Sequence, residues 1–77
     1  MGGKIEAMYR IKHVDGNPYL QVINVHDFKL NKDVYELYWQ DGARCFLNKE
    51  GCFTDYQECT IAIHHFYGYN NVEEVCF

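Results

Sequence analysis

The first third of the chain carries an alternating pattern of apolar and polar residues. Apolar side chains at every second position over residues 5–11 alternate with mostly polar ones, which is the period of a half-buried strand. Residues 15–18 (Asp-Gly-Asn-Pro) follow and are typical of a turn. Residues 19–28, which are rich in Val and Ile, predict a second strand. The pattern therefore predicts a β-hairpin.

The position of Pro18 sets the register that we expect in this hairpin. Proline has no amide hydrogen to donate to a strand ladder, so we place it in the loop, with Val14 opposite Tyr19. This register puts Asn24 and His26 on the face of the second strand that should meet the core. Because two polar residues are unexpected there, a slip of one residue stays open.

A second hairpin is predicted around Asp41-Gly42, the strongest short turn signal in the chain. Residues 34–40 and 43–48 flank this dipeptide and have the composition of strands. A two-residue turn would place Trp39 opposite Arg44, within reach of a cation–π contact.

Residues 54–67 carry the period of an amphipathic helix, and Gly68 is typical of the residue that ends one. Thr54 and Gln57 match the capping box, in which each side chain bonds a free backbone amide. Five residues form one stripe that we expect to face the core: Tyr56, Cys59, Ile63, Phe66 and Tyr67. Three residues lie on the opposite side of the helix: Glu58, Ile61 and His65. Residues 72–77 predict a short final strand.

Together these elements predict a single α+β domain that spans residues 1–77. We expect an antiparallel sheet of about four to five strands, made of two hairpins and a C-terminal strand, with one amphipathic helix packed on one face. The other face would be left to water or to a partner. Its predicted members are too apolar for a face that meets only solvent: Met8, Arg10, Lys12, Gln21, Ile23, Val25, Glu36, Tyr38, Cys45 and Leu47.

Composition and charge limit the classes of partner. Hydrophobic residues make up 48% of the 77 residues, which is ample for one core. All seven Lys and Arg precede Glu50, whereas residues 50–77 hold five acids and no Lys or Arg, within a net charge of −4. A helix without a basic residue is a poor match to phosphates, so helix-in-groove DNA binding is disfavoured.

Targeting signals are missing from the sequence. No stretch approaches the roughly 20 apolar residues of a spanning helix, and the N-terminus lacks the apolar core of a signal peptide. We therefore expect a cytoplasmic protein, in a cell or an infected host cell, without membrane contact. In that compartment the four cysteines would be reduced thiols.

Four Cys and four His raise the question of a zinc site. The spacings Cys45-x6-Cys52-x6-Cys59 contain no Cys-x2–4-Cys knuckle, which structural zinc sites usually have. Cys59 also falls on the core-facing stripe, where a thiol behaves as a small hydrophobe. We expect no metal and no cofactor. A small zinc-binding domain that uses these three cysteines and His64 is a lesser alternative.

The sequence offers no catalytic dyad. His64 and His65 lie in the last predicted helical turn, where a cation is favoured whether or not it has a chemical role. The surroundings of Cys52 are acidic, which raises a thiol pKa and makes the sulfur less nucleophilic. We therefore expect no enzymatic activity.

The candidate functional surface is the sheet face that the helix leaves free. We expect it to bind a protein partner, and Tyr, Met and Arg are types enriched in such interfaces. The contacts are assigned to seven residues: Met8, Arg10, Lys12, Ile23, Val25, Tyr38 and Leu47. Small acidic α+β proteins without recognisable motifs are common among phage products that bind and block host machinery, so a phage or viral inhibitor is one form of this function. A homodimer through the same stripe is another.

A single-stranded nucleic-acid-binding module is the main alternative. Several RNA-binding modules stack bases on exposed aromatics of a sheet, with Arg and Lys nearby. Tyr38, Arg10 and Lys12 have the residue types for that role. The negative net charge and the missing RNP motif disfavour it.

Overall fold

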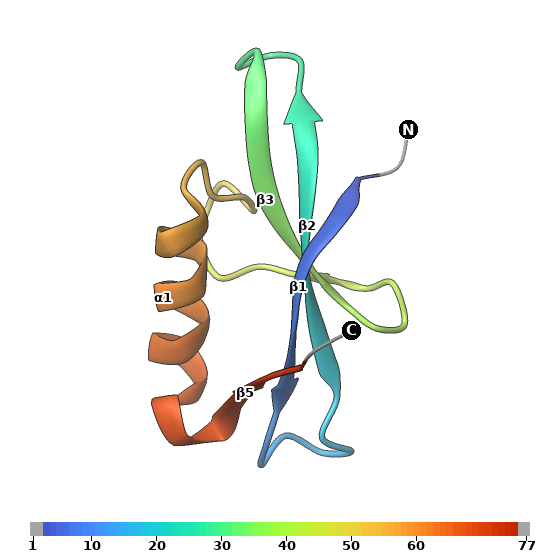
Figure 1. Ribbon diagram of the computed structural model, residues 1–77, viewed down its shortest axis with the longest axis vertical. Helices are drawn as coiled ribbons and strands as arrows, with labels where there is room; N and C mark the ends of the chain where they lie inside the picture. The colour runs from blue at the N-terminus through green and yellow to red at the C-terminus, as the bar shows by residue number, and fades with distance from the viewer. Residues whose placement is uncertain (1–2, 76–77) are drawn as a thin grey trace.

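An antiparallel sheet of five strands, with one helix against it, makes up the fold (Figure 1). The computed structural model describes residues 3–75. The strands run in the spatial order β4-β3-β2-β1-β5. Their bounds are β1 (Lys4–Ile11), β2 (Tyr19–Asp27), β3 (Lys32–Trp39), β4 (Arg44–Cys45) and β5 (Val72–Glu74). Helix α1 (Tyr56–Tyr67) leads through the 3₁₀ helix η1 (Tyr69–Asn71) into β5. The predicted α+β class and arrangement are confirmed, while residues 76–77 of the predicted last strand lie outside the described residues.

The hydrophobic core lies between α1 and the face of the sheet that this helix covers, which we call the inner face. Successive strand residues point to opposite faces, so alternate positions of β1 and β2 supply this core. Its buried members are Ala7, Tyr9, Ile11, Leu20, Val22, Leu37, Cys45, Cys59 and Ile63. Partly buried aromatic residues pack around them: Tyr35, Trp39, Phe53, Tyr56 and Tyr67.

The pairing of β1 with β2 differs from the predicted register by four residues. Arg10, not Val14, lies opposite Tyr19. The chain leaves the strand after Ile11 because the following loop takes a left-handed backbone at three positions, among them His13 with φ 66°. Val14 instead packs against the core from this loop. A shift of four is even, so Ala7 to Arg10 still point to their predicted faces. A β-bulge between Ile5 and Ala7 changes the register there, so Ile5 lies opposite Ile23 and not on its predicted core face.

The pairing of β3 with β4 differs from the predicted register by one residue. Leu37 lies opposite Cys45, and Tyr38, not Trp39, lies opposite Arg44. A shift of one residue reverses the face of every side chain on the shifted strand. Cys45, which was predicted on the free face, is therefore in the core and only 7% exposed.

The turn between β3 and β4 explains this shift. The amide of Trp39 donates to the carbonyl of Ala43 at 2.8 Å, which closes a loop of three residues instead of two. Gly42 has φ 95°, and a left-handed residue at the end of a three-residue loop is the usual way to rejoin the strand. The carboxylate of Asp41 accepts a hydrogen bond from the Ala43 amide at 3.0 Å and holds the loop in this form.

Helix α1 begins one residue later than the capping box predicted. Asp55 is the N-cap, and its carboxylate accepts a hydrogen bond from the Gln57 amide at 2.9 Å. The predicted cap at Thr54 is therefore wrong, although the predicted end is confirmed. Gly68 has φ 93°, and its amide donates to the carbonyl of His64 at 2.8 Å.

The β2–β3 hairpin projects past the end of α1 and forms one end of the molecule (Figure 1). Its pairing is continuous from Leu20–Trp39 to Asp27–Lys32. Asn24 lies opposite Tyr35 and His26 opposite Asp33, so the inner face carries these two polar residues without a slip of register. They are tolerated because both reach solvent, since Asn24 is half-buried and His26 is exposed.

Candidate protein-interaction surfaces

The outer face is the side of the sheet opposite α1, and it holds most of the predicted contact residues. Cross-strand pairing places Met8 beside Gln21, Gln21 beside Tyr38, and Val25 beside Val34. Between residues 3 and 75, α1 is the one α-helix, and it lies against the other face. Five predicted contact residues lie on the outer face: Met8, Arg10, Ile23, Val25 and Tyr38.

Two predicted contact residues lie elsewhere. Lys12 is exposed and follows directly after the end of β1, at the rim of the outer face. Leu47 lies beyond β4 and packs against the core beside α1, so its predicted place on the outer face is wrong. The cause is the one-residue shift of β4, which reversed the faces of the residues after the turn.

Two arginines on the outer face stack on tyrosine rings. The guanidinium of Arg10 lies 5.1 Å from the ring centre of Tyr19 and donates a hydrogen bond to its hydroxyl. The guanidinium of Arg44 lies 5.1 Å from the ring centre of Tyr38. The predicted stack of Arg44 on Trp39 is therefore wrong. Stacking holds these flexible side chains in defined positions.

Glu36 ties the second stack together. The Tyr38 hydroxyl donates to the Glu36 carboxylate at 2.8 Å, and an Arg44 nitrogen lies 3.9 Å from a carboxylate oxygen of Glu36. The hydrogen bond to Glu36, and then burial, raise the pKa of Tyr38, so its hydroxyl stays protonated near neutral pH. Arg44 also donates to the carbonyl of Gly51. These bonds fix the β3–β4 side of the outer face.

The outer face exposes less apolar surface than the sequence predicted. Met8, Ile23 and Val25 are half-buried, and Val34 on the same face is only 1% exposed. Among the described residues, two exposed large apolar side chains, Ile5 and Phe46, lie on this face, and the others lie on the β2–β3 turn, on α1 and just after it. The outer face therefore presents a mixed apolar and polar surface.

A basic cleft opens at the end of the outer face nearest the β1–β2 loop. It is lined by Arg10, Lys12, His13 and Asn17. Glu73 lies opposite Arg10 on β5, and no ion pair joins them within the described chain. The cleft is a place where an anionic group of a partner could be bound by charge-assisted hydrogen bonds.

An apolar groove, which we call the helix groove, lies between α1 and the segment that precedes it. Its apolar lining includes Leu47, Phe53, Ile61 and Phe66. Phe66 is 66% exposed, so its predicted place on the core-facing stripe is wrong. Its position lies at the edge of the helical stripe, and its ring turns outward against that of Tyr67, with ring centres 4.8 Å apart.

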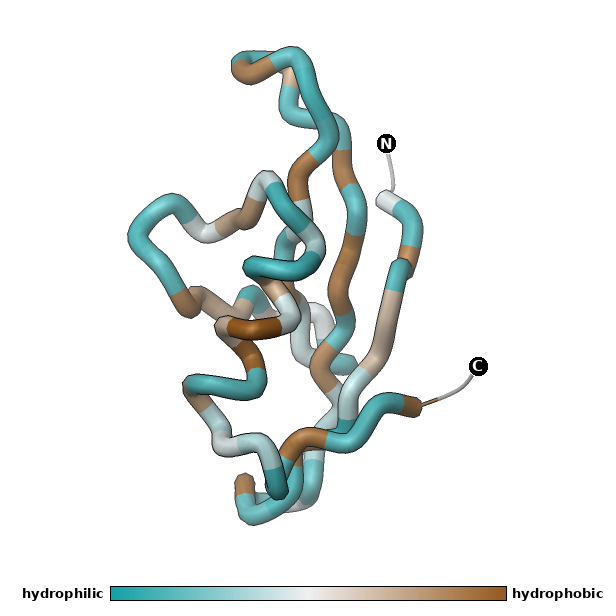
Figure 2. Tube along the Cα trace, turned by 60° about the vertical axis from the view of Figure 1, so that its left-hand side comes forward, coloured by the Kyte–Doolittle hydropathy of each residue, from teal (hydrophilic) through white to brown (hydrophobic). Residues whose placement is uncertain are grey.

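A second exposed apolar feature is the turn of the β2–β3 hairpin, residues 28–31, which we call the hairpin tip. Figure 2 shows hydrophobic segments in this turn at the far end of the molecule. Phe28 is 80% exposed and Leu30 is 52% exposed. Phe28 was predicted as the end of the second strand and Leu30 was assigned to no element, so this exposed pair was not predicted from the sequence. A Phe and a Leu within a four-residue turn are the signal that could have found them.

Three cysteines lie in the described part of the chain, where Cys45 and Cys59 are buried and Cys52 is half-buried. Within residues 3–75, no group of three or more His, Cys, Asp or Glu side chains lies close enough together to hold a metal ion. Burial raises the pKa of the Cys59 thiol to about 12, and the nearby Cys45 adds to this shift. The Cys45 sulfur lies 3.7 Å from the Tyr67 hydroxyl oxygen. Burial raises the pKa of the Cys45 thiol as well. Burial is the largest cause that raises the pKa of the Cys52 thiol, and nearby carboxylates raise it further.

The fold and these surfaces define a small α+β protein with an antiparallel sheet and one helix. In comparisons with known proteins, no family model matches the chain, and no curated protein or solved structure gives a significant match. None of the helices in the described part of the chain has the length and apolar character that a membrane crossing requires.

Proposed function

We propose that this protein binds a protein partner through the outer face of its sheet. The observation that carries the proposal is the grouping, on the face that α1 leaves free, of apolar side chains with two arginine–tyrosine stacks. Tyrosine, methionine and arginine are enriched in protein interfaces. Because the stacks hold Tyr19 and Tyr38 with their arginines in place, little side-chain entropy is lost when a partner binds.

Charge on this face favours an acidic partner. Arg10 and Lys12 line the basic cleft, whereas the carboxylate of Glu36 is already bonded by Tyr38 and Arg44. A partner that presents carboxylates at the cleft would gain charge-assisted bonds there. Association should then be slower at high salt, because exposed charges mainly steer the encounter.

The cytoplasm is the proposed place of action. The three described cysteines are free thiols, which suits a reducing compartment. A partner whose own activity falls on binding would make this protein an inhibitor, such as those that phages and viruses direct at host machinery. Binding, rather than catalysis or metal chemistry, is the proposed role.

Affinity capture from cells of the source organism tests this proposal. Tagged wild-type protein should retain a specific protein partner. If Tyr38 and Ile23 are central contacts, Tyr38→Ala or Ile23→Ala should weaken the binding free energy for that partner by about 1–3 kcal/mol. Gln57→Ala is the matched control, because Gln57 is exposed on α1 at the other side of the molecule. Equal retention by all four proteins would contradict the proposal.

Single-stranded nucleic acid is the second candidate, and the basic cleft is the observation that favours it. Against it, the arginines already cover the Tyr19 and Tyr38 rings on which bases would stack. Gel-shift series with single-stranded DNA and RNA at low salt distinguish the two candidates. A shift at micromolar protein that disappears steeply with salt would favour nucleic acid, and no shift would remove this candidate.

A further inference from the structure

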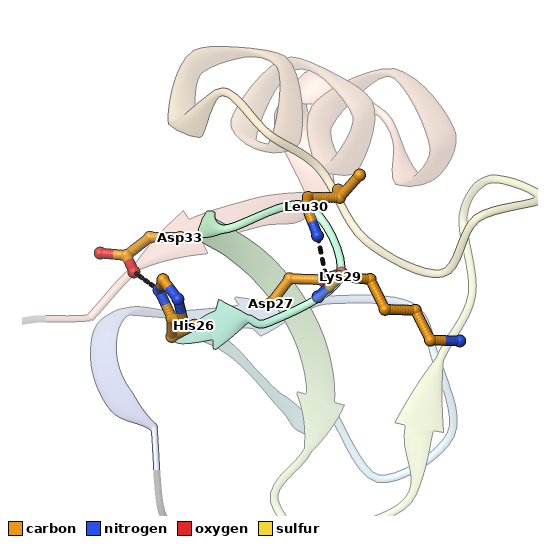
Figure 3. Close-up of polar contacts among 5 residues, drawn as sticks. All are labelled: His26, Asp27, Lys29, Leu30 and Asp33. Atoms are coloured by element: carbon orange, nitrogen blue, oxygen red, sulfur yellow. Dashed lines mark hydrogen bonds and ion pairs between the residues drawn. The ribbon is translucent and has the colours of Figure 1, made fainter.

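The hairpin tip combines apolar side chains with free positive charge. Phe28 and Leu30 project into solvent, and Lys29 lies between them. The neighbouring carboxylates are engaged, as Figure 3 shows. Asp27 accepts hydrogen bonds from the amides of Lys29 and Leu30 at 2.9 and 3.2 Å, and Asp33 lies 3.1 Å from the His26 ring nitrogen. The charge of Lys29 is therefore available to a partner.

The tip is also held in one shape. The two strands beneath it are paired up to Asp27 and Lys32, and the two bonds to the Asp27 carboxylate fix the turn. The ring of Phe28 packs edge-to-face on His26, with ring centres 4.7 Å apart. A preformed projection of this kind needs little further ordering when it binds.

The helix groove has the complementary character. It has a volume of about 430 Å³, and its exposed wall is formed by Ile61 (55% exposed) and Phe66. The carboxylate of Glu58 lies on its rim. No Lys or Arg occurs between Glu50 and the end of the chain, and His65 is the one side chain of the groove lining that can carry a positive charge.

We propose that the hairpin tip of one copy of this protein binds in the helix groove of a second copy. Phe28 and Leu30 would enter the apolar groove, and Lys29 would face Glu58. The tip does not line its own groove, so the contact joins two molecules. A membrane surface would account for the tip alone, whereas a second copy accounts for both exposed apolar features. This contact does not involve the outer face and is independent of the function proposed above.

The geometry of the contact determines the assembly. A single tip-to-groove contact joins two different surfaces and is therefore heterologous, and the dimer that it forms leaves one tip and one groove free. The contact would bury less than the roughly 1,200–2,000 Å² of stable interfaces, so we expect a dissociation constant on the order of 0.1–1 mM. The protein should be monomeric when dilute and form head-to-tail chains when concentrated.

Complementation between two variants tests the proposal. The tip variant carries Phe28→Ser and Leu30→Ser, and the groove variant carries Ile61→Ser and Phe66→Ser. In sedimentation equilibrium from about 10 µM to about 1 mM, wild-type mass should rise with concentration while each variant stays monomeric. An equimolar mixture should form dimers and nothing larger, because each variant retains one working half.

Amide NMR spectra of the same samples show where the contact lies. Unlabelled tip variant added to labelled groove variant should shift the labelled signals of residues 28–31, and the reverse labelling should shift those around Glu58. Dispersed spectra like that of the wild type establish that both variants are folded. Wild type that stays monomeric at about 1 mM, or a mixture that does not associate, would overturn the proposal.

Charge reversal provides a milder pair of variants. Lys29→Glu and Glu58→Lys should each weaken self-association by about 2–5-fold at low salt, and the two changes in one chain should restore it. The outer-face variant Ile23→Ser should self-associate like wild type. If Ile23→Ser abolishes association, or charge reversal has no effect at low salt, the tip-to-groove contact is wrong.

Discussion

Phe46→Ala and Cys45→Asp, measured side by side, test the register of β4 and with it the assignment of the two faces. Phe46 is 64% exposed, so its ring buries about one third of the roughly 200 Å² that a buried phenylalanine removes from water. At about 25 cal/mol per Å², the loss of this contact should lower the free energy of unfolding by about 1–2 kcal/mol. The loss comes mainly from the contact with Arg44, whose guanidinium lies 4.8 Å from the ring centre of Phe46.

Cys45→Asp should be far more harmful. Cys45 is only 7% exposed, and its sulfur lies beside the Tyr67 hydroxyl within the core. A carboxylate in this place has no cation beside it, so we expect a loss of more than about 3 kcal/mol, or a protein that does not fold.

If a two-residue turn joined β3 and β4, as the sequence predicted, both variants should show the opposite effect on stability. In that register Phe46 would lie opposite Leu37 in the core, and its truncation should cost about 3–5 kcal/mol. Residue 45 would meet solvent, where Asp should change the free energy of unfolding by less than about 0.5 kcal/mol. Urea unfolding, followed by the fluorescence of Trp39, measures both quantities. A large loss for Phe46→Ala together with a small one for Cys45→Asp would refute the observed register.

Three further predictions concern the helix and the buried titratable groups. Asp55→Ala should lower the free energy of unfolding by about 1 kcal/mol in urea unfolding, and Thr54→Ala should change it little, because Asp55 is the cap. Burial raises the pKa of Cys59 and of Tyr9 to about 12, so both are kept neutral by folding. The stability they confer is complete below the unfolded pKa values of about 8.5 and 10, and it should be lost as pH rises through these values toward 12. Unfolding curves that do not change between neutral pH and pH 11 would contradict this. In native protein at neutral pH, iodoacetamide should alkylate Cys52 before Cys59, as mass spectrometry would show; equal rates would mean that Cys59 is not buried.

The sequence predicted the class and order of the elements because these depend on local periodicity and turn chemistry. Alternation in residues 5–11, the turn at residues 15–18 and the Gly68 helix end all act within a few residues. Registers were harder to predict. The length of a loop depends on where the chain enters left-handed conformations, such as those at His13 and Gly42, and sequence alone allows several solutions.

The candidate surfaces were only partly predictable, for a related reason. The predicted faces of Met8 and Ile23 were correct because the shift of β1 at Met8 is even, and that of Tyr38 was correct because the one-residue shift falls on β4. Leu47 was misplaced by a shift of one residue. The exposure of Phe28 depends on how far the β2–β3 hairpin projects, and that of Phe66 on how much of the helix surface the rest of the chain covers. Both are tertiary properties that cannot be predicted from the periodicity of the sequence.

Hydroxyl-radical footprinting of the protein, alone and bound to its captured partner, shows whether the outer face carries partner recognition. Radicals oxidise accessible methionine and aromatic side chains, so Met8 and Tyr38 report on the outer face, while Phe28 and Phe66 report on the hairpin tip and the helix groove. If the outer face binds the partner, binding should lower the oxidation rates of Met8 and Tyr38 several-fold and leave those of Phe28 and Phe66 unchanged. Protection of Phe28 or Phe66, with Met8 and Tyr38 oxidised as fast as in the free protein, would contradict it.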